Sequence, residues 1–303
     1  MPRAKQPKQI HQMTIAQWEE AFPDEQACDT YLVARRWPNG VHCPRCGSAR
    51  PYPLQTMAFK WECPDCSESG YRFSNIAGTI FENTNVDLRQ WFRVIHLMLT
   101  SKKGVSARQV QRYMSFGSYK TAWYMCYRIR AALVEKNPDK LGGVVEIDET
   151  FVGGKPHNKH GKDRDGKPGG TASGKTAVVG AVSRRGRVVA RVIADVSADT
   201  LTSFVQESVS NKVSLLCTDQ WTGHRKLKAE YPHKVIRHTS GEYVVGAVHT
   251  NTIEGFWSIF KCGVVGTFHK VSKKYLPLYI AEFEFRYNNR HNEDIFGTAV
   301  GGC

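Results

Sequence analysis

The sequence predicts an α/β protein whose sheet begins near residue 142, with smaller modules in front of it. Three observations carry this prediction. Runs of β-branched residues at 144–147 and 176–182 are typical of buried strands. Residues 86–136 show the apolar periodicity of helices with few helix breakers, and residues 38–80 are rich in Cys, Pro, Gly and aromatic residues. The chain therefore divides into a metal-stapled part, a helical part and an α/β part.

Length and charge narrow the class of protein. A chain of 303 residues is long enough for about two domains. Its 42 Lys and Arg against 28 Asp and Glu give a formal net charge of +14, which favours nucleic acid as a partner. The alternative is a generic basic protein, such as a ribosomal or otherwise RNA-bound one. No apolar run approaches the roughly 18 residues that span a bilayer, and no signal core follows the basic N-terminus. We expect a soluble, cytoplasmic protein with no membrane partner.

Four of the nine cysteines form two C-x-x-C knuckles with 16 residues between them, Cys43 with Cys46 and Cys63 with Cys66. Two thiolates at this spacing can point at one ion, and two such knuckles complete the tetrahedral shell that Zn²⁺ prefers. A redox dithiol would need only one knuckle. Because all four ligands come from the protein, the predicted Zn²⁺ is structural and has no open position for catalysis.

The helical part has the layout of a helix-turn-helix. An apolar helix over 88–99 ends at a Gly-containing break, Ser106 is the expected N-cap of a helix over 107–113, and a turn at 115–118 leads into a helix over 119–133. In a DNA-binding helix-turn-helix the last helix lies in the major groove. We expect DNA contacts from Lys120, Thr121 and Arg128, while a helical hairpin that binds nothing remains the alternative.

Acidic residues follow the predicted strands of the α/β part. Asp148 ends the strand 144–147, Asp219 follows the apolar strand 213–217, and Glu254 lies on a helix that begins near Asn251. Burying isolated carboxylates is costly unless a cation compensates them, and hard cations prefer oxygen ligands. Three acids from separate elements therefore predict a Mg²⁺ or Mn²⁺ site.

The expected order of elements is three antiparallel strands, a crossover helix over 198–210, a parallel strand and a last helix, with acids on the two central strands. This is the ribonuclease-H-like arrangement, in which two metal ions serve phosphoryl transfer. We expect four regions and a frayed C-terminal end from about 297. The regions are an N-terminal helical segment (1–37), a zinc ribbon (38–80), a helix-turn-helix-like segment (85–138) and a ribonuclease-H-like domain (142–295).

These motifs resemble bacterial insertion-sequence transposases of the zinc-ribbon DDE type. The resemblance runs from the ribbon to about residue 292 and rests on VEIDET at 145–150 with the GGK at 153–155, TD at 218–219, NTIEGFWS at 251–258 with Lys261, and EFEFRYNNR at 282–290. It implies that Asp148, Asp219 and Glu254 hold two Mg²⁺ or Mn²⁺ ions and that Lys261 contacts DNA. It also implies a homodimer or higher multimer on double-stranded DNA.

Some members of that family have Asn as the third ligand, and Asn251 lies one helical turn before Glu254; we favour Glu254 because it contributes charge. The implied activity is cleavage at transposon ends followed by strand transfer into target DNA. The rival hypotheses are a non-enzymatic zinc-ribbon regulator, a domesticated inactive relative and a nuclease that cuts without joining.

Further polar residues have two interpretations each. Strand alternation places Glu146 on the same face as Asp148, so it is either an outer acid of the site or a surface residue. Glu149 points to the opposite face. His224 and His249 flank the acids, and a surface or packing role is favoured for each. Arg286 and Arg290 follow Glu282 at helical spacing, so they contact DNA or pair within their helix. Trp257 is expected in the core, and the Gly- and Lys-rich stretch 157–175 is expected to be a flexible loop.

Overall fold

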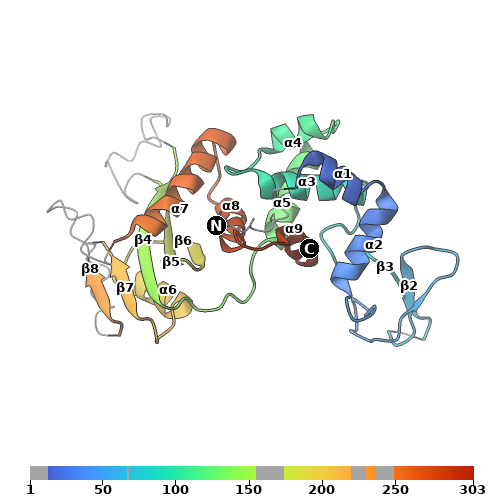
Figure 1. The fold of residues 1–303 in the computed structure, drawn as a ribbon, viewed down its shortest axis with the longest axis horizontal. Coiled ribbons are helices and arrows are strands. Elements are labelled where there is room, and N and C mark those ends of the chain that lie inside the picture. The colour runs from blue at the N-terminus through green and yellow to red at the C-terminus, as the bar shows by residue number, and fades with distance from the viewer. Residues whose placement is uncertain (1–12, 67, 155–173, 220–229, 236–248) are drawn as a thin grey trace, which may run out of the picture. The chain divides into compact units, whose positions relative to one another are not determined.

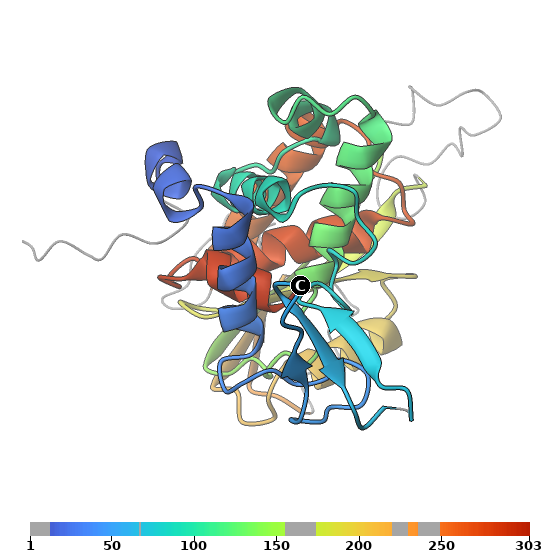
Figure 2. The same ribbon diagram turned by 90° about the vertical axis from the view of Figure 1, so that its right-hand side faces the viewer.

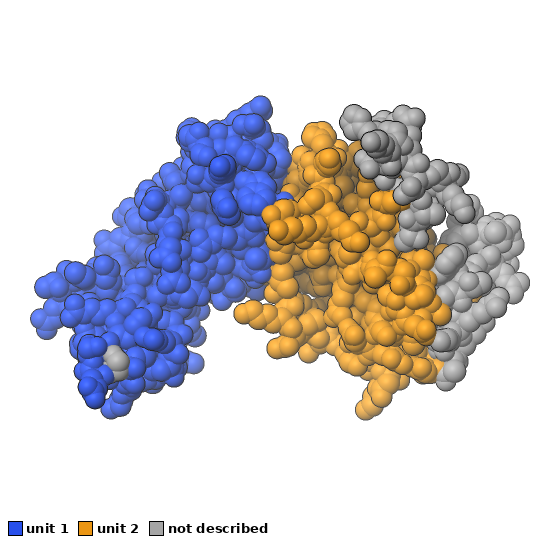
Figure 3. All heavy atoms as spheres, turned by 180° about the vertical axis from the view of Figure 1, so that it is seen from behind, with its two compact units in different colours: residues 1–133, 291–303 blue, residues 134–290 orange. Residues whose placement is uncertain are grey.

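The computed structural model describes residues 13–66, 68–154, 174–219, 230–235 and 249–303. The chain forms two compact units, Met1–Leu133 with His291–Cys303 (unit 1) and Val134–Arg290 (unit 2) (Figure 3). The predicted loop 157–175 and His224 fall largely or wholly outside the described residues. Within the described part of the chain, no helix combines the length and apolarity needed to cross a membrane.

Unit 1 is built mainly from helices, most of which have a side-chain cap at their first turn. They are α1 (Ile15–Ala21), α2 (Glu25–Arg36), α3 (Leu88–Thr100), α4 (Ala107–Tyr113), α5 (Tyr119–Ala132) and α9 (Ile295–Gly301) (Figure 1). The predicted N-cap of α4 is confirmed, because the Ser106 hydroxyl accepts the N–H of Gln109 while the Gln109 side chain accepts the N–H of Ser106. Two backbone N–H groups at the start of the helix are thereby satisfied.

The helices of unit 1 pack around a cluster of aromatic rings. Phe296 of α9 is 2% exposed, and its ring centroid lies 5.4 Å from that of Phe92 and 5.5 Å from that of Phe22. Asp294 caps α9 by accepting the N–H of Gly297 at 2.9 Å. The expectation of a frayed C-terminal end is therefore wrong: this end is a helix, α9, and the partners that bury Phe296 lie more than two hundred residues earlier in the chain.

A small antiparallel sheet also belongs to unit 1. Its strands are β1 (Tyr52–Pro53), β2 (Lys60–Cys63) and β3 (Tyr71–Ser74), in the order β1-β2-β3; they are the blue-to-cyan arrows of Figure 2. The rings of Trp61 and Phe73 stack with centroids 6.0 Å apart, and Trp37 meets Trp61 edge-on at 5.4 Å. These three rings form the apolar side of an otherwise very small module.

In the part of unit 2 that the structure describes, five strands form a mixed sheet in the order β6-β5-β4-β7-β8. β4 pairs antiparallel with β5 and parallel with β7, and the predicted antiparallel strands, crossover helix and parallel strand follow one another as expected. The strands are β4 (Val144–Val152), β5 (Thr176–Ser183), β6 (Val188–Ile193), β7 (Leu215–Thr218) and β8 (His233–Val235), and the helices are α6 (Ala198–Ser208), α7 (Asn251–Cys262) with its π-helical continuation η7 (Gly263–Phe268), and α8 (Leu276–Asn288) (Figure 1).

The two faces of this sheet are covered by different helices. Val145 and Ile147 of β4 pack in one core with Leu201 and Val205 of α6. Val178 and Val182 of β5 pack in the opposite core, which contains α7 and α8. Because side chains alternate along a strand, Glu146 and Asp148 lie on the face that α7 covers.

Gly180 allows α7 to approach the sheet closely. It is the register partner of Asp148 on β5. A Cβ atom at this position would lie 2.6 Å from Cζ2 of Trp257 and 3.2 Å from Cδ1 of Ile253. Trp257 is 3% exposed, as predicted for a core residue. The indole therefore occupies the space that any side chain at position 180 would need.

We expect Gly180→Ala to lower the free energy of unfolding by about 1–3 kcal/mol, because the added methyl overpacks the contact between β5 and α7. Urea denaturation followed by tryptophan fluorescence measures this loss. Gly255→Ala is the matched control: it lies within α7, has no atom within 4 Å of its added Cβ, and should be stabilising by up to about 1 kcal/mol. Equal stability of the two variants would refute the close-approach interpretation.

Candidate functional site

The four predicted zinc ligands come together in unit 1. The Sγ atoms of Cys43 and Cys66 are 3.4 Å apart, those of Cys46 and Cys63 are 3.6 Å apart, and all four lie within 4.8 Å of one another. Tetrahedral Zn–S bonds of about 2.3 Å place sulfurs roughly 3.8 Å apart. The set therefore fits one Zn²⁺, and it closes a site at which no position is left for substrate.

Backbone donors and one carboxylate support the two knuckles. Burial raises the pKa of the Cys43 thiol, but the backbone N–H groups of Cys46 and Arg45 outweigh it and lower the pKa to about 7. Asp65, within the second knuckle, accepts hydrogen bonds from Ser48 and Arg50, which follow the first. The thiolate form that Zn²⁺ requires is therefore favoured at Cys43, whereas burial raises the pKa of the Cys63 and Cys66 thiols. Asp65 ties the two knuckles together.

The strand register of unit 2 brings the predicted acids to one level. β4 and β7 run parallel with Glu146 opposite Cys217. Two residues further along each strand are Asp148 and Asp219, so they are neighbours at the carboxyl end of β7. Thr218, just before Asp219, is buried, and its hydroxyl lies 2.7 Å from Nε2 of His233 on β8.

Electrostatics places Glu254 within reach of the same point. Burial is the largest cause that raises the pKa of Asp148, to about 7, and the charges of Glu149, Asp219 and Glu254 add to it. Glu254 is exposed and accepts a hydrogen bond from the Thr250 hydroxyl at 2.8 Å. Asp148 on β4 is therefore within electrostatic reach of both Asp219, directly after β7, and Glu254 on α7.

These acids are less compact than the cysteines. Among the residues that the structure describes, only the four cysteines gather three or more such ligand atoms within 4.8 Å. Wider spacing is compatible with ligands shared between two cations, which sit about 3.5–4 Å apart in two-metal sites. Carboxylate oxygens are the donors that Mg²⁺ and Mn²⁺ prefer, so the donor set fits these ions.

Glu146 holds the helix that carries Glu254. Its carboxylate is fully buried and accepts the backbone N–H groups of Thr252 at 2.8 Å and Ile253 at 3.1 Å, in the first turn of α7. The Thr252 hydroxyl donates to it at 2.9 Å, and Nε of Arg184 donates at 2.6 Å. Glu146 is therefore a tertiary cap, because it satisfies amide groups that α7 cannot pair by itself.

The surface interpretation of Glu146 is therefore wrong, and its partners were missed. Arg184, which follows β5, also donates through Nη2 to the carbonyl oxygen of His249 at 2.9 Å. Nδ1 of His249 lies 3.2 Å from Glu146, so this histidine belongs to the buried network, as a packing role predicts. The basic residue after β5 could have been weighed as a counter-ion for a buried acid, but no local pattern links it to residue 252.

The predicted DNA contacts differ in their surroundings. Lys120 and Lys261 are exposed, and Thr121 is half-buried; Asn251, the alternative metal ligand, is also exposed. Arg128 donates to the carbonyl oxygen of Glu82 at 3.0 Å. Arg286 lies 3.5 Å from the buried Glu282, the pairing within one helix that the spacing allowed, and Arg290 donates to the carbonyl oxygen of Tyr287 at 2.7 Å.

We expect Glu146→Gln to destabilise unit 2 by about 3–5 kcal/mol, because it leaves Arg184 facing an uncharged group in a buried network. Chemical denaturation measures the loss. Glu207→Gln is the control, since Glu207 pairs with Arg191 where both side chains are more than 40% exposed, and such pairs contribute about 0–1 kcal/mol. A loss for Glu146→Gln no larger than for this control would contradict the capping role.

Comparison with known proteins agrees with both parts of the chain. Residues 23–69 match the family model of a transposase zinc-ribbon domain, and residues 140–288 match that of an ISXO2-like transposase domain. An uncharacterized protein in the transposable element ISH50 of Halobacterium salinarum is 28% identical over 280 residues, which cover 88% of this chain and 92% of that protein. The chain therefore carries, in order, the zinc-ribbon and ISXO2-like domains of insertion-sequence transposases.

Proposed function

We propose that this protein is a DNA transposase that cleaves phosphodiester bonds at the ends of its element and joins the freed 3′ ends to target DNA. One observation carries the proposal: three acids from β4, the end of β7 and α7 lie within electrostatic reach on one face of a mixed sheet. The strand order, with β4 between an antiparallel and a parallel neighbour, supports a ribonuclease-H-like catalytic domain.

In this proposal Asp148, Asp219 and Glu254 hold two Mg²⁺ or Mn²⁺ ions. When bound, such ions activate the attacking oxygen and stabilise the leaving one. The chain itself supplies position: β4 and β7 fix the two aspartates by register, and the Glu146 cap fixes the helix that carries Glu254. Asn251 is the alternative third ligand, and it lies in the first turn of the same helix.

The DNA contacts proposed are Lys120, Thr121, Arg128, Lys261, Arg286 and Arg290. Lys261, in the last turn of α7, is exposed and separated from Glu254 by two helical turns. We infer that it neutralises a phosphate near the cut. Two ends must be joined to one target, and the resemblance to DDE transposases implies a multimer, so we propose a homodimer or higher multimer on DNA.

The rival functions meet a specific difficulty. A zinc-ribbon regulator that only binds DNA has no use for acids that repel one another and weaken the fold, and neither has a domesticated protein that has lost its chemistry. The acids favour an enzyme, because the unfavourable free energy of placing carboxylates close together in a partly buried site is offset only when cations occupy the site. A nuclease that cuts without joining shares the same acids, and product analysis separates it from a transposase.

Asp219→Ala should reduce cleavage and joining by about 1,000-fold or more, because it removes a metal ligand used in both steps. The assay incubates a duplex carrying the element's own ends with Mg²⁺ or Mn²⁺ and a target plasmid, and resolves cut and joined products on a gel. Asp139→Asn, whose side chain is 97% exposed, is the control and should retain full activity. DNA affinity should be unchanged in both variants. Normal joining by Asp219→Ala would refute the site.

Asp148→Asn should stabilise the protein in the absence of divalent metal. The folded state raises the pKa of Asp148 to about 7, so it binds the proton more tightly than the unfolded chain does. Stability contributed by this group therefore falls as pH rises from about 4 to about 7 and stays low above that, and the asparagine variant escapes a penalty of the order of a few kcal/mol at pH 8.

Thermal unfolding at pH 5 and pH 8, with and without Mg²⁺, measures this. The variant should exceed the wild type at pH 8 without metal, and only the wild type should gain stability when Mg²⁺ is added. Asp139→Asn should behave as the wild type under all four conditions. A wild type that is as stable as Asp148→Asn at pH 8 without metal would contradict the raised pKa of Asp148.

A further inference from the structure

The chain from residue 88 to residue 134 contains nine Lys and Arg and no Asp or Glu. Several of these cations are used inside unit 1: Arg89 and Arg93 both pair with Glu19, and Arg130 is buried. Others are exposed on α4, where the chain offers no local carboxylate to neutralise them. A concentration of unpaired positive charge on one helix is an electrostatic footprint for a polyanion.

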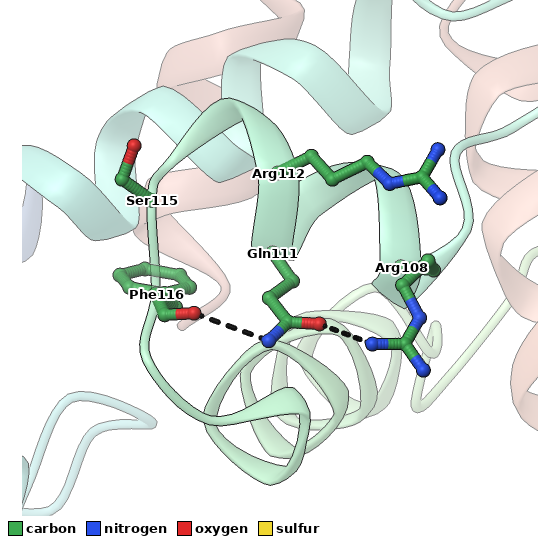
Figure 4. Close-up of a pocket in the computed structure, with 5 residues that line it drawn as sticks. All are labelled: Arg108, Gln111, Arg112, Ser115 and Phe116. Carbon is green, nitrogen blue, oxygen red and sulfur yellow. Dashed lines mark hydrogen bonds between the residues drawn. The ribbon is translucent and has the colours of Figure 1, made fainter.

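Two arginines on α4 line a hollow beside the turn between α4 and α5. The hollow measures about 550 Å³ and is lined by Arg108, Gln111, Arg112, Ser115 and Phe116 (Figure 4). Arg108 and Arg112 are four residues apart, so their side chains leave the same side of the helix. Figure 4 shows both guanidinium groups extending on one side of α4, with Gln111 between them and the turn.

One of the two arginines is held in place before any ligand arrives. Nη1 of Arg108 donates to Oε1 of Gln111 at 2.8 Å, and its guanidinium lies 5.0 Å from the ring centroid of Tyr119. Nε2 of Gln111 in turn donates to the carbonyl oxygen of Phe116 at 3.2 Å. This chain of contacts ties the arginine to the turn and to the first residue of α5, which lowers the entropy lost on binding.

Arg112, in contrast to Arg108, is not held by contacts within the described part of the protein. It is exposed, and among the described residues its guanidinium has no hydrogen-bond or ion-pair partner. A planar guanidinium presents paired N–H donors that match two oxygens of a phosphate group. The hollow is therefore lined by one guanidinium that is held in place and one that is available to a phosphate.

We propose that this hollow binds a backbone phosphate of duplex DNA and so sets the position of α5 on the DNA. The proposal rests on the proposed function, because it takes DNA as the partner. It adds a contact on α4 that the prediction of Lys120, Thr121 and Arg128 on α5 did not include. In helix-turn-helix proteins the first helix crosses the DNA backbone while the second enters the groove.

The hydrogen bonds of Gln111 indicate that the hollow binds the DNA backbone and does not recognise a base. A glutamine reads adenine through its amide oxygen and nitrogen together, but both atoms of Gln111 are engaged, with Arg108 and with the Phe116 carbonyl. The hollow therefore contributes affinity that does not depend on sequence, together with register. Lys120 and Tyr119, exposed at the start of α5, are left to contact the groove.

Binding of the full-length protein to two duplexes tests this, one with the element's terminal sequence and one scrambled, in the absence of divalent metal. Arg112→Gln should weaken binding to both duplexes by the same factor, about 3- to 10-fold near 0.1 M salt, and should lower the slope of log Kd against log salt by about 0.9. Lys212→Gln removes an equal charge from an exposed position of unit 2 and should leave the slope unchanged.

A scan of the duplex with single methylphosphonate linkages then locates the phosphate. At one linkage the neutral backbone should weaken the wild type but not weaken Arg112→Gln further, as expected when both changes remove the same contact. An unchanged slope for Arg112→Gln, or a loss confined to the terminal sequence, would overturn the phosphate site while leaving the proposed function standing. Failure of the wild type to bind either duplex would overturn both.

Inorganic phosphate separates a free-anion site from a DNA contact. At equal ionic strength, phosphate should compete with DNA no better than sulfate does. Saturable competition by phosphate in the wild type but not in Arg112→Gln would instead assign the hollow to free phosphate and overturn the duplex proposal.

Discussion

The buried carboxylate of Glu146 is the contact on which the arrangement of the acids depends. It joins β4 to the first turn of α7 through two backbone N–H groups and a hydroxyl, and it is neutralised by Arg184. A fully buried charge is tolerated only when its hydrogen-bonding capacity is satisfied. The position of α7 that satisfies Glu146 is therefore strongly favoured, and it is also the position that brings Glu254 within electrostatic reach of Asp148.

A second constraint acts from the other side of α7. Gly180 leaves room for Trp257 and Ile253 against β5, so the helix approaches the sheet more closely than any other residue at that position would permit. Packing and capping thus hold Asp148 in a buried position close to other negative charges, where its ionised form is disfavoured. Stability generated by the core and by the Glu146 network offsets the repulsion within the site, as is common where function requires an unfavourable charge arrangement.

Local patterns were enough to predict much of this protein. The two C-x-x-C knuckles, the capped helix at 107–113 and the β-branched strands are recognised within a few residues of sequence, and the structure contains all of them. Alternation along β4 also predicted correctly that Glu146 shares a face with Asp148. These features depend on neighbours that lie close along the chain.

The missed features depend on partners that are distant in sequence. Glu146 bonds residues 106 positions away, and a lone acid on a strand gives no sign of whether it will be capped, paired or exposed. Phe296 is buried against Phe22 and Phe92, yet the seven-residue helix that carries it is too short to be distinguished from a frayed end by periodicity. In both cases the tertiary fold supplies the partner that makes the residue's position favourable.

The two units use the same device to fix a helix. In unit 1 the Glu25 carboxylate of α2 accepts the N–H groups of Leu88 at 2.5 Å and Arg89 at 2.8 Å, at the start of α3. In unit 2 Glu146 does the same for α7. Neither Asp87 nor Thr250, the residues that precede these helices, makes a side-chain cap. The first backbone N–H groups of each helix are therefore satisfied only when the distant acid is in place. This couples formation of the first turn to the folding of the unit.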